Sequence, residues 1–156
     1  MNRFVFAILC LLMSWQVHAW PAKVVGVHDG DSITVLREGN VQVKIRLEGI
    51  DAPELKQPFG NAAKKALSDL VFGKTVEVKE TGKDRYARTL ATVTVGSLDA
   101  NLEMVKTGFA WHYAKYSKDQ MLKEAQMEAQ AAKLGLWADK EPVMPWEWRK
   151  KPKASK

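Results

Sequence analysis

The chain is poor in the side chains that form cross-links or bind transition metals. It has one cysteine, Cys10, and three histidines among its 156 residues. One cysteine excludes a disulfide within the chain, and a thiolate zinc site needs several. His28 and His112 are too few and too far apart in sequence for a histidine zinc site. Any metal chemistry therefore depends on oxygen ligands.

Long apolar runs are also scarce. The longest, Phe4 to Trp15, follows Arg3 and precedes small residues that end at Ala19. It has about 12 residues, whereas roughly 20 are needed to cross a bilayer. This pattern is typical of a secretory signal peptide, residues 1–19, and a membrane anchor is the alternative. We expect cleavage after Ala19, export to the periplasm or the medium, and no membrane segment in the mature chain.

Net charge is lacking in most of the chain. The formal charge is +6, but Arg3 and the basic residues of "RKKPKASK", residues 149–156, account for it. Residues 20–148 hold equal numbers of basic and acidic side chains, so net charge does not predict that this part binds a polyanion. We expect one domain at 20–148 followed by a basic tail. The tail is either a solvated, disordered terminus or a segment that binds nucleic acid.

Hydrophobic periodicity predicts an α+β chain. Apolar residues at every second position predict strands at about 24–27, 33–35, 41–50, 74–81 and 89–95. Helical patterns, each followed by a glycine, cover 60–72, 99–107 and 118–134. One helix follows the third strand and two follow the fifth. A five-stranded Greek-key barrel of the OB type with three helices is the compact arrangement that we expect.

Two turns next to predicted strands are rich in carboxylates. They are "HDGDS" and "GIDAPE", whose acidic residues are Asp29, Asp31, Asp51 and Glu54. A proline after Ala52 holds that residue extended and fixes the direction of its carbonyl. Carboxylate and carbonyl oxygens are ligands for Ca²⁺ or Mg²⁺. The alternative is ordinary turn chemistry, because aspartate and glycine are common where a chain reverses.

Two arginines accompany these turns. Arg46 lies on the polar face of the 41–50 strand, and Arg88 ends the loop "KDRYAR". An arginine donates paired hydrogen bonds to a phosphate and stays charged at any working pH. A hard cation, a glutamate and two guanidinium groups can together hydrolyse a phosphodiester. Ion pairing of Arg46 with Glu48 or Asp51 is the alternative.

Four motifs, in the order "HDGDSITV", "KIRLEGIDAPE", "DRYARTLATV" and "EAQAAKLGLW", closely resemble the staphylococcal nuclease family, also called micrococcal nuclease or thermonuclease. The resemblance runs from about Val24 to Trp137. It implies an OB-type barrel and a sequence-tolerant phosphodiesterase that needs one Ca²⁺ ion. It also implies that DNA and RNA are substrates and that the products carry 3′-phosphates. We expect a monomer.

The resemblance implies roles for the acidic turns. Asp31 and Asp51 match the family's calcium carboxylates, and Ala52 matches the residue that supplies a backbone carbonyl to the ion. Asp29 matches an acidic position next to these ligands, which supports them without itself binding the ion. Because the ligand at Ala52 is a main-chain atom, the side chain at this position is free to vary.

The resemblance also implies the catalytic residues. Arg46 and Arg88 match the family's two phosphate-binding arginines, and Glu54 matches the residue that deprotonates or positions water. The rival hypothesis is a catalytically inactive module of the same fold that binds nucleic acid without cutting it. The presence of all the acidic and arginine positions favours the enzyme.

Aromatic residues supply further candidates. Tyr86 matches a family position and could stack on a base or a sugar, or could be a packed tyrosine at the barrel rim. Tyr113 and Tyr116 are three residues apart, where the family has two, and are candidates for the same role. In "PVMPWEWR", Trp146 and Trp148 are either a platform for nucleic acid or a clasp that packs on the barrel. We favour the clasp.

Overall fold

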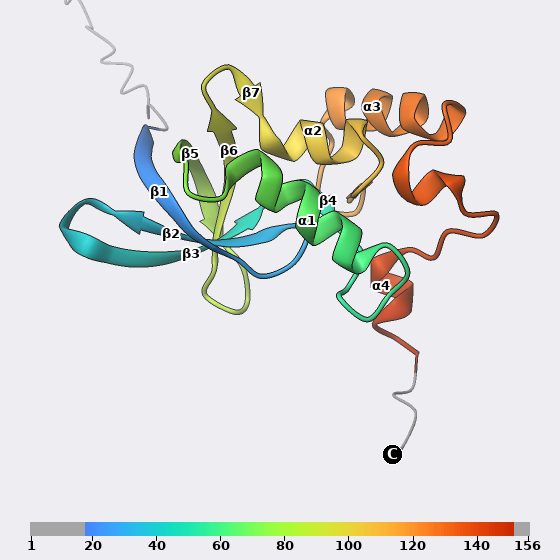
Figure 1. Ribbon diagram of the computed structural model, residues 1–156, viewed down its shortest axis with the longest axis horizontal. Helices are drawn as coiled ribbons and strands as arrows, with labels where there is room; N and C mark the ends of the chain where they lie inside the picture. The colour runs from blue at the N-terminus through green and yellow to red at the C-terminus, as the bar shows by residue number, and fades with distance from the viewer. Residues whose placement is uncertain (1–17, 152–156) are drawn as a thin grey trace, which may run out of the picture.

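Five strands close into a barrel in the computed structural model, which describes residues 18–151 (Figure 1). The strands are β1 (Ala19–Val27), β2 (Ser32–Arg37), β3 (Val41–Leu47), β5 (Thr75–Lys83) and β6 (Thr89–Val95). They lie in the order β3-β2-β1-β5-β6 with antiparallel neighbours, and a parallel pairing of β3 with β6 closes the barrel. This mixed barrel with helices confirms the predicted α+β, OB-like fold.

Three short strands were not predicted. β7 (Leu98–Asp99) forms a hairpin with β6, and β4 (Ile50–Asp51) pairs with β8 (Trp111–His112). The predicted strand at 41–50 is therefore wrong in its extent, because β3 ends at Leu47. The chain turns at Gly49, whose φ of +76° suits glycine. The turn carries Asp51 out of the barrel wall and into β4, where it pairs with Trp111 of β8.

The helices follow the predicted segments and pack against the barrel. They are α1 (Gly60–Val71), α2 (Ala100–Lys106) and α3 (Gln120–Ala131). In α1, Ala63, Leu67 and Val71 lie four residues apart and are completely buried, which explains how this helix covers the barrel. Two 3₁₀ turns, η1 (Glu38–Asn40) and η2 (Gly135–Ala138), and a short helix α4 (Pro145–Trp148) were not predicted.

A buried asparagine ties α2 to the end of the barrel that carries the turn after β3. The side-chain oxygen of Asn101 accepts from the amide of Val93 at 3.1 Å, and its nitrogen donates to the carbonyls of Ala91 and Glu48 at 3.0 Å. The amide of Glu48 also donates to the Ala91 carbonyl at 2.9 Å. Because polar groups buried here are paired, the turn between β3 and β4 has a fixed position.

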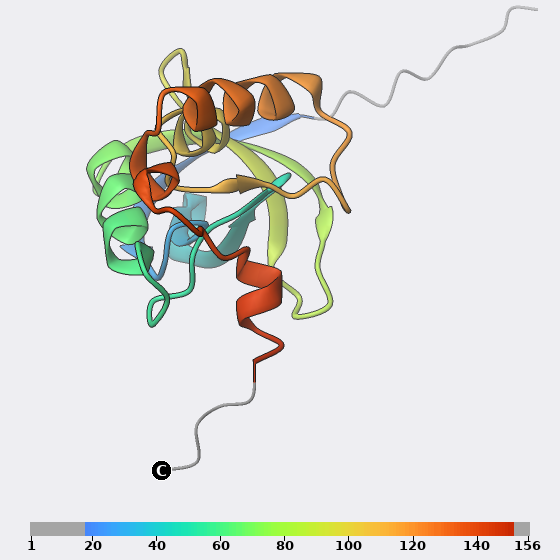
Figure 2. The same ribbon diagram turned by 90° about the vertical axis from the view of Figure 1, so that its right-hand side faces the viewer.

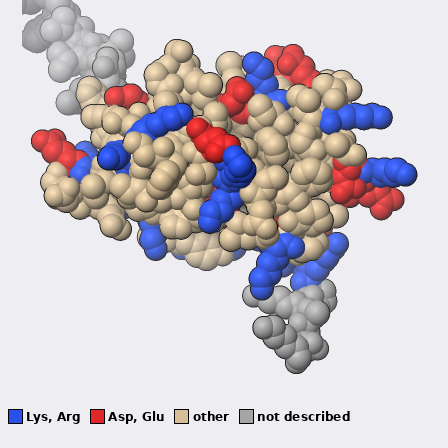
Figure 3. Space-filling model, in the orientation of Figure 1, with Lys and Arg blue, Asp and Glu red and all other residues tan. Residues whose placement is uncertain are grey.

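The C-terminal helix α4 and the loop between β5 and β6 both project from the same end of the barrel (Figures 1 and 2). The face that carries α1 shows acidic and basic side chains interspersed, as a formally neutral domain should (Figure 3). Within residues 18–151, no helix is long and apolar enough to span a bilayer. Residues 1–17 of the expected signal peptide and 152–156 of the basic tail lie outside the described residues. Cleavage after Ala19 therefore stays a prediction.

Candidate active site

A cleft of about 640 Å³ lies between the turns at one end of the barrel, the β5–β6 loop and the C-terminal helix. It brings together every residue that the sequence analysis singled out for the site. Its lining includes Asp29, Asp31, Arg46, Asp51, Ala52, Glu54, Tyr86, Arg88, Tyr113 and Tyr116. These residues come from segments more than 80 positions apart in the chain, so the fold, and not sequence proximity, makes them neighbours.

Asp31 is held where β1 turns into β2. Its backbone carbonyl accepts from the amide of Leu47 at 2.8 Å, which ties the turn to β3. Its Oδ2 accepts from the amide of Ala52 at 2.7 Å, and its Oδ1 accepts from the hydroxyl of Ser32 at 3.1 Å. The acidic turn and the chain after β4 are therefore joined through this carboxylate.

Gly30 and Asp29 shape the same turn. A Cβ on Gly30 would lie 2.6 Å from the Cβ of Ala52 and 2.7 Å from that of Ala63, so only glycine fits between the site and α1. The Oδ1 of Asp29 accepts from the amide of Asp31 at 3.0 Å. Asp29 thus forms the aspartate turn that was the alternative interpretation, and the same hydrogen bond fixes the position of Asp31.

Arg46 lies between the two carboxylates that were predicted to bind calcium. One of its terminal nitrogens is 3.2 Å from Oδ2 of Asp31 and 3.0 Å from Oδ1 of Asp51. The other donates to the carbonyls of Leu47 and Ile50, both at 2.8 Å. The ion pair with Asp51 that was weighed as an alternative is present, and Asp31 extends it to a buried three-residue cluster.

Burial shifts the ionisation of both aspartates. Desolvation raises the pKa of Asp31 from 3.8 to about 6, against the lowering effect of Arg46, and the neighbouring Asp29 raises it further. Desolvation also raises the pKa of Asp51, against hydrogen bonds from Arg149 that lower it. Two carboxylates kept so close together in a poorly hydrated place have a strong preference for a cation between them.

Carboxylate oxygens are the type of ligand that a hard divalent cation prefers, and in this structure arginines pair with those of Asp31 and Asp51. The side-chain oxygens of Asp31 and Asp51 converge on one guanidinium nitrogen, and Ala52 follows directly in the chain. Within the described part of the chain, no group of three or more histidine, cysteine, aspartate and glutamate side chains is placed to hold a metal ion. The remaining ligands would have to be backbone carbonyls, water or substrate oxygens, as is common for Ca²⁺. The carbonyl ligand at Ala52 stays a prediction.

Glu54 lies at the open edge of the cleft, with a side chain that is 40% exposed. Its backbone amide donates to the side-chain oxygen of Gln57 at 3.2 Å, and its carbonyl accepts from the amide of Gln57 at 2.8 Å. A Cβ on Gly60 would overlap the carbonyl of Glu54, so α1 begins with glycine directly against this loop. The loop fixes the backbone of Glu54, and its carboxylate accepts a hydrogen bond from Arg149 at 2.8 Å.

Arg88 approaches the site from the opposite wall. Its Nε donates to Oδ2 of Asp84 at 2.8 Å, and one terminal nitrogen donates to the hydroxyl of Ser32 at 3.1 Å. Ser32 in turn donates to Asp31, so Arg88 and the buried carboxylate share one hydrogen-bond chain. The guanidinium group is thereby oriented toward the cleft before any ligand binds.

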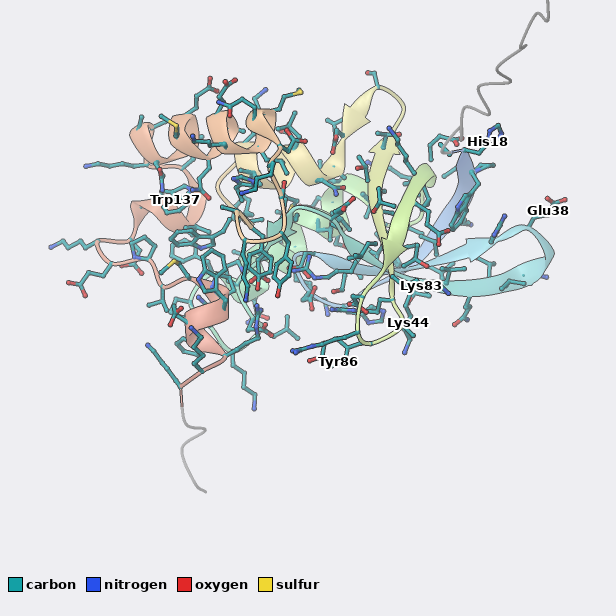
Figure 4. All side chains as sticks on the ribbon, turned by 180° about the vertical axis from the view of Figure 1, so that it is seen from behind. His18, Glu38, Lys44, Lys83, Tyr86 and Trp137 are labelled. Atoms are coloured by element: carbon teal, nitrogen blue, oxygen red, sulfur yellow. The ribbon has the colours of Figure 1, made fainter. Side chains whose placement is uncertain are left out.

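The three tyrosines differ in their surroundings. Tyr86, at the tip of the β5–β6 loop in Figure 4, is 65% exposed, which is inconsistent with a tyrosine packed in the barrel rim. Tyr116 is 67% exposed and meets Tyr113 edge-on, with ring centres 4.7 Å apart. Tyr113 is stacked on Trp146, with ring centres 5.0 Å apart and planes inclined by 8°. One face of Tyr113 is therefore already covered.

Trp146 packs on other aromatic residues, as a clasp would, but its partners belong to β8 and the residue after it and not to the barrel strands. Besides stacking on Tyr113, its ring meets Trp111 edge-on at 5.8 Å, and Trp111 packs on Trp137 at 4.3 Å. Trp148 is only partly buried, and the amine of Lys151 lies 5.2 Å from its ring centre. The aromatic column holds α4 against β8.

Arg149, which was expected to belong to the basic tail, is part of the site. Its guanidinium group donates to Oδ2 of Asp51 at 2.7 Å and to Glu54 at 2.8 Å. The hydrogen bonds that Arg149 donates to Asp51 and, to a lesser extent, to Glu54 raise its pKa above an already high value, against partial burial, which lowers it. The available signal was an arginine directly after "PWEW", where a proline can begin a helix and two tryptophans can anchor it.

Comparison with known proteins gives a consistent result. Residues 44–139 match the family described as staphylococcal nuclease homologue. A Haemophilus influenzae protein named as an uncharacterized endonuclease is 51% identical over 131 residues, which cover 84% of this chain and 74% of that protein.

Two further relatives match over nearly their full length. An Escherichia coli O157:H7 protein, also named as an uncharacterized endonuclease, is 41% identical over 152 residues, 96% of this chain and 98% of its own. A Shigella flexneri protein named micrococcal nuclease is 39% identical over 162 aligned positions, 95% of this chain and 91% of its own. The closed barrel, the cleft with its carboxylates and arginines, and these matches together show that the chain belongs to the staphylococcal nuclease family.

Proposed function

We propose that this chain is a calcium-dependent nuclease that hydrolyses DNA and RNA without sequence preference and leaves 3′-phosphates. The observation that carries the proposal is the buried cluster in which the carboxylates of Asp31 and Asp51 flank the guanidinium group of Arg46. The cluster supports a site where a cation and an arginine act on the same phosphate. The micrococcal nuclease name of the Shigella flexneri relative supports nucleic acid as the substrate class.

Each residue then has one task. Asp31, Asp51 and the carbonyl of Ala52 would hold the calcium ion, which would offset negative charge on the phosphate. Arg46 and Arg88 donate hydrogen bonds to the phosphate oxygens from two sides of the cleft. Hydrogen bonds within the protein already hold Asp31, Arg46 and Arg88, so little reorganisation is needed when charge builds up on phosphorus.

Glu54 acts on the attacking water. Its carboxylate accepts the water proton while the water oxygen forms a bond to phosphorus. The bond from phosphorus to the 5′ oxygen breaks, and that oxygen takes up a proton from solvent in the open cleft. The products are a 3′-phosphate and a 5′-hydroxyl. Tyr86 and Tyr116 are both exposed at the cleft. Their rings would stack on the bases of DNA or RNA, which is consistent with low sequence preference.

A plasmid-relaxation assay on purified residues 20–156 tests the proposal. We expect nicking and then linearisation with Ca²⁺, and none with EDTA. Equal and negligible cleavage in both, together with retained binding of a labelled oligonucleotide, would favour the inactive binding module instead. The variant Glu54→Gln should lose about a hundredfold or more in kcat while its affinity for the oligonucleotide stays close to wild type. An unchanged rate would remove Glu54 from the reaction.

We further propose that the protein works as a monomer outside the cytoplasm. The apolar leader followed by small residues supports export after cleavage at Ala19. N-terminal sequencing of protein recovered from the periplasm and from the medium would give Trp20 as the first residue. An intact Met1 would contradict export by this route. Light scattering of the purified enzyme at micromolar concentration should give the mass of one chain.

A further inference from the structure

The short helix α4 is fixed against the site by contacts along its whole length. The carbonyl of Val143, just before the helix, accepts from the side chain of Gln57 at 2.6 Å. Pro145 is buried, and Trp146 stacks on Tyr113. Because Gln57 also accepts from the amide of Glu54, one side chain links the approach to α4 with the loop that carries the glutamate.

Arg149 follows the last residue of the helix, and its side chain bridges two carboxylates with different proposed tasks. It donates to both oxygens of Asp51, at 3.2 and 2.7 Å, and to one oxygen of Glu54 at 2.8 Å. Asp51 is buried, with a side chain 1% exposed, whereas the side chain of Glu54 is 40% exposed. Arg149 therefore connects a buried carboxylate to an exposed one.

Glu54 has little else to hold it. Among residues 18–151, only Arg149 donates a hydrogen bond to the carboxylate of Glu54. A glutamate side chain has three rotatable bonds, so an exposed carboxylate samples many positions unless something restrains it. A group that must accept a proton from a water at one point has to be held within a fraction of an ångström of its working position.

Arginine suits this bridge better than lysine. Its planar fork presents several N–H groups in fixed directions and can serve two acceptors at once. A lysine amine carries the same charge on one atom and lacks that fork. The bridge thus depends on guanidinium geometry as well as on charge.

We propose that Arg149 is a positioning residue of the nuclease reaction, which acts through Glu54 by holding its carboxylate against Asp51. The inference rests on the proposed role of Glu54 with water. It assigns a task to α4, a segment that lies beyond the residues matched by the family description, which end at 139. Loss of Arg149 should slow the chemical step and leave substrate binding almost unchanged.

Steady-state kinetics on residues 20–156 in saturating Ca²⁺ test this assignment with three variants. Arg149→Gln removes the bridge, Arg149→Lys keeps the charge without the fork, and Lys150→Gln is the matched control. Lys150 carries the same charge one position on and pairs with Glu147 at the surface, away from the site. We expect kcat to fall about tenfold to a hundredfold in Arg149→Gln and nearly as far in Arg149→Lys. KM should stay within about threefold, and Lys150→Gln should match wild type.

A double-mutant cycle with Glu54→Gln shows whether Arg149 acts through the glutamate. In the Glu54→Gln background, adding Arg149→Gln should cost less than about threefold in kcat, since the group to be positioned has already lost its function. A full, independent loss in that background would overturn the proposal. So would a wild-type rate in Arg149→Lys.

Two binding measurements, which need no turnover, separate the rival roles of Arg149. Fluorescence anisotropy with a labelled single-stranded oligonucleotide in EDTA should give the same affinity for Arg149→Gln and Lys150→Gln. A selective loss in Arg149→Gln would make Arg149 a phosphate ligand and overturn the positioning role. Calorimetric titration with Ca²⁺ is the second measurement. Tighter calcium binding together with faster cleavage in Arg149→Gln would make Arg149 a competitor of the ion, and would also overturn it.

The wild-type enzyme separates failure of this inference from failure of the proposed function. If wild type does not cleave in Ca²⁺, both the proposed function and the positioning role of Arg149 are refuted. If wild type cleaves and Arg149→Gln cleaves equally well, only the positioning role falls. Circular dichroism of each variant confirms that the fold is intact, and a folded Arg149→Lys keeps the test valid if Arg149→Gln does not fold.

Discussion

Replacing Arg46 by methionine should destabilise the protein before any question of catalysis arises. The Arg46 side chain is 12% exposed and faces Asp31 and Asp51, whose side chains are 7% and 1% exposed. Methionine keeps the apolar stem but removes the charge and the hydrogen bonds to two backbone carbonyls. Two buried carboxylates then face each other with less compensating charge.

The expected loss of stability is about 3 kcal/mol. Breaking a buried ion pair by removing one partner costs roughly 3–5 kcal/mol, because the other charge is left buried and unpaired. We take the lower end, since Arg149 still pairs with Asp51 at 2.7 Å. For a domain of this size the melting temperature should fall by about 10 °C. The control Arg85→Met removes an exposed arginine and should change stability by no more than about 0.5 kcal/mol.

Urea unfolding in EDTA and in Ca²⁺ checks both parts of this reasoning. In EDTA, Arg46→Met should unfold at clearly lower urea than wild type and Arg85→Met. A ligand that binds only the folded state stabilises it by about 2.7 kcal/mol at a hundred times its Kd. Because methionine no longer competes for the aspartate oxygens, calcium should stabilise Arg46→Met more than wild type. Equal midpoints in EDTA would refute the stabilising role of the buried ion pair, and the absence of a calcium effect on the variant would refute the cation site.

Two other substitutions probe the walls of the cleft. Asp84→Asn should cost about 1 kcal/mol in urea unfolding at pH 7 and raise KM, because it loosens Arg88. Partial burial raises the pKa of Asp84, but hydrogen bonds from Arg88 lower it by more, so the pKa lies below 3.8. The difference in stability between wild type and Asp84→Asn should therefore persist above that pH and shrink below it. A difference that does not change with pH would contradict the ion pair. Gly30→Ala should cost about 2 kcal/mol or more in thermal unfolding and reduce calcium affinity, since its Cβ would lie 2.6 Å from another methyl carbon. Gly82→Ala, where a Cβ meets nothing within 4 Å, is the control, and equal stability of the two variants would refute the steric argument.

Much of the fold could be predicted from local pattern. The alternation at 41–47 and the spacing of Ala63, Leu67 and Val71 reflect single strands and helices with one buried face. Such patterns show that one face of an element is buried, but not which other element covers it or pairs with it. The parallel pairing of β3 with β6 therefore could not be predicted from them. The pairing of β4 with β8 was missed because each strand has only two residues.

The site was predictable where its motifs lie in continuous stretches. Asp51, Ala52 and Glu54 belong to one such stretch, and the family resemblance named their tasks. Arg149 reaches the same carboxylates across more than 90 residues of sequence, so the "PWEW" segment before it could indicate an anchored helix but not which residues Arg149 would contact. Its charge placed it with the basic tail, although packing of Trp146 on Tyr113 determines where it lies.

We propose that one cation, held by Asp31 and Asp51 beside Arg46, is needed to cut the phosphodiester. The most direct test is the initial rate of cleavage of a labelled oligonucleotide over a range of free calcium, for wild type and for Asp51→Asn. We predict that the wild-type rate rises and saturates as for a single ion, and that Asp51→Asn is at least about a hundredfold slower at wild-type saturation. A rate that does not depend on free calcium, or that is the same in both proteins, would contradict the account.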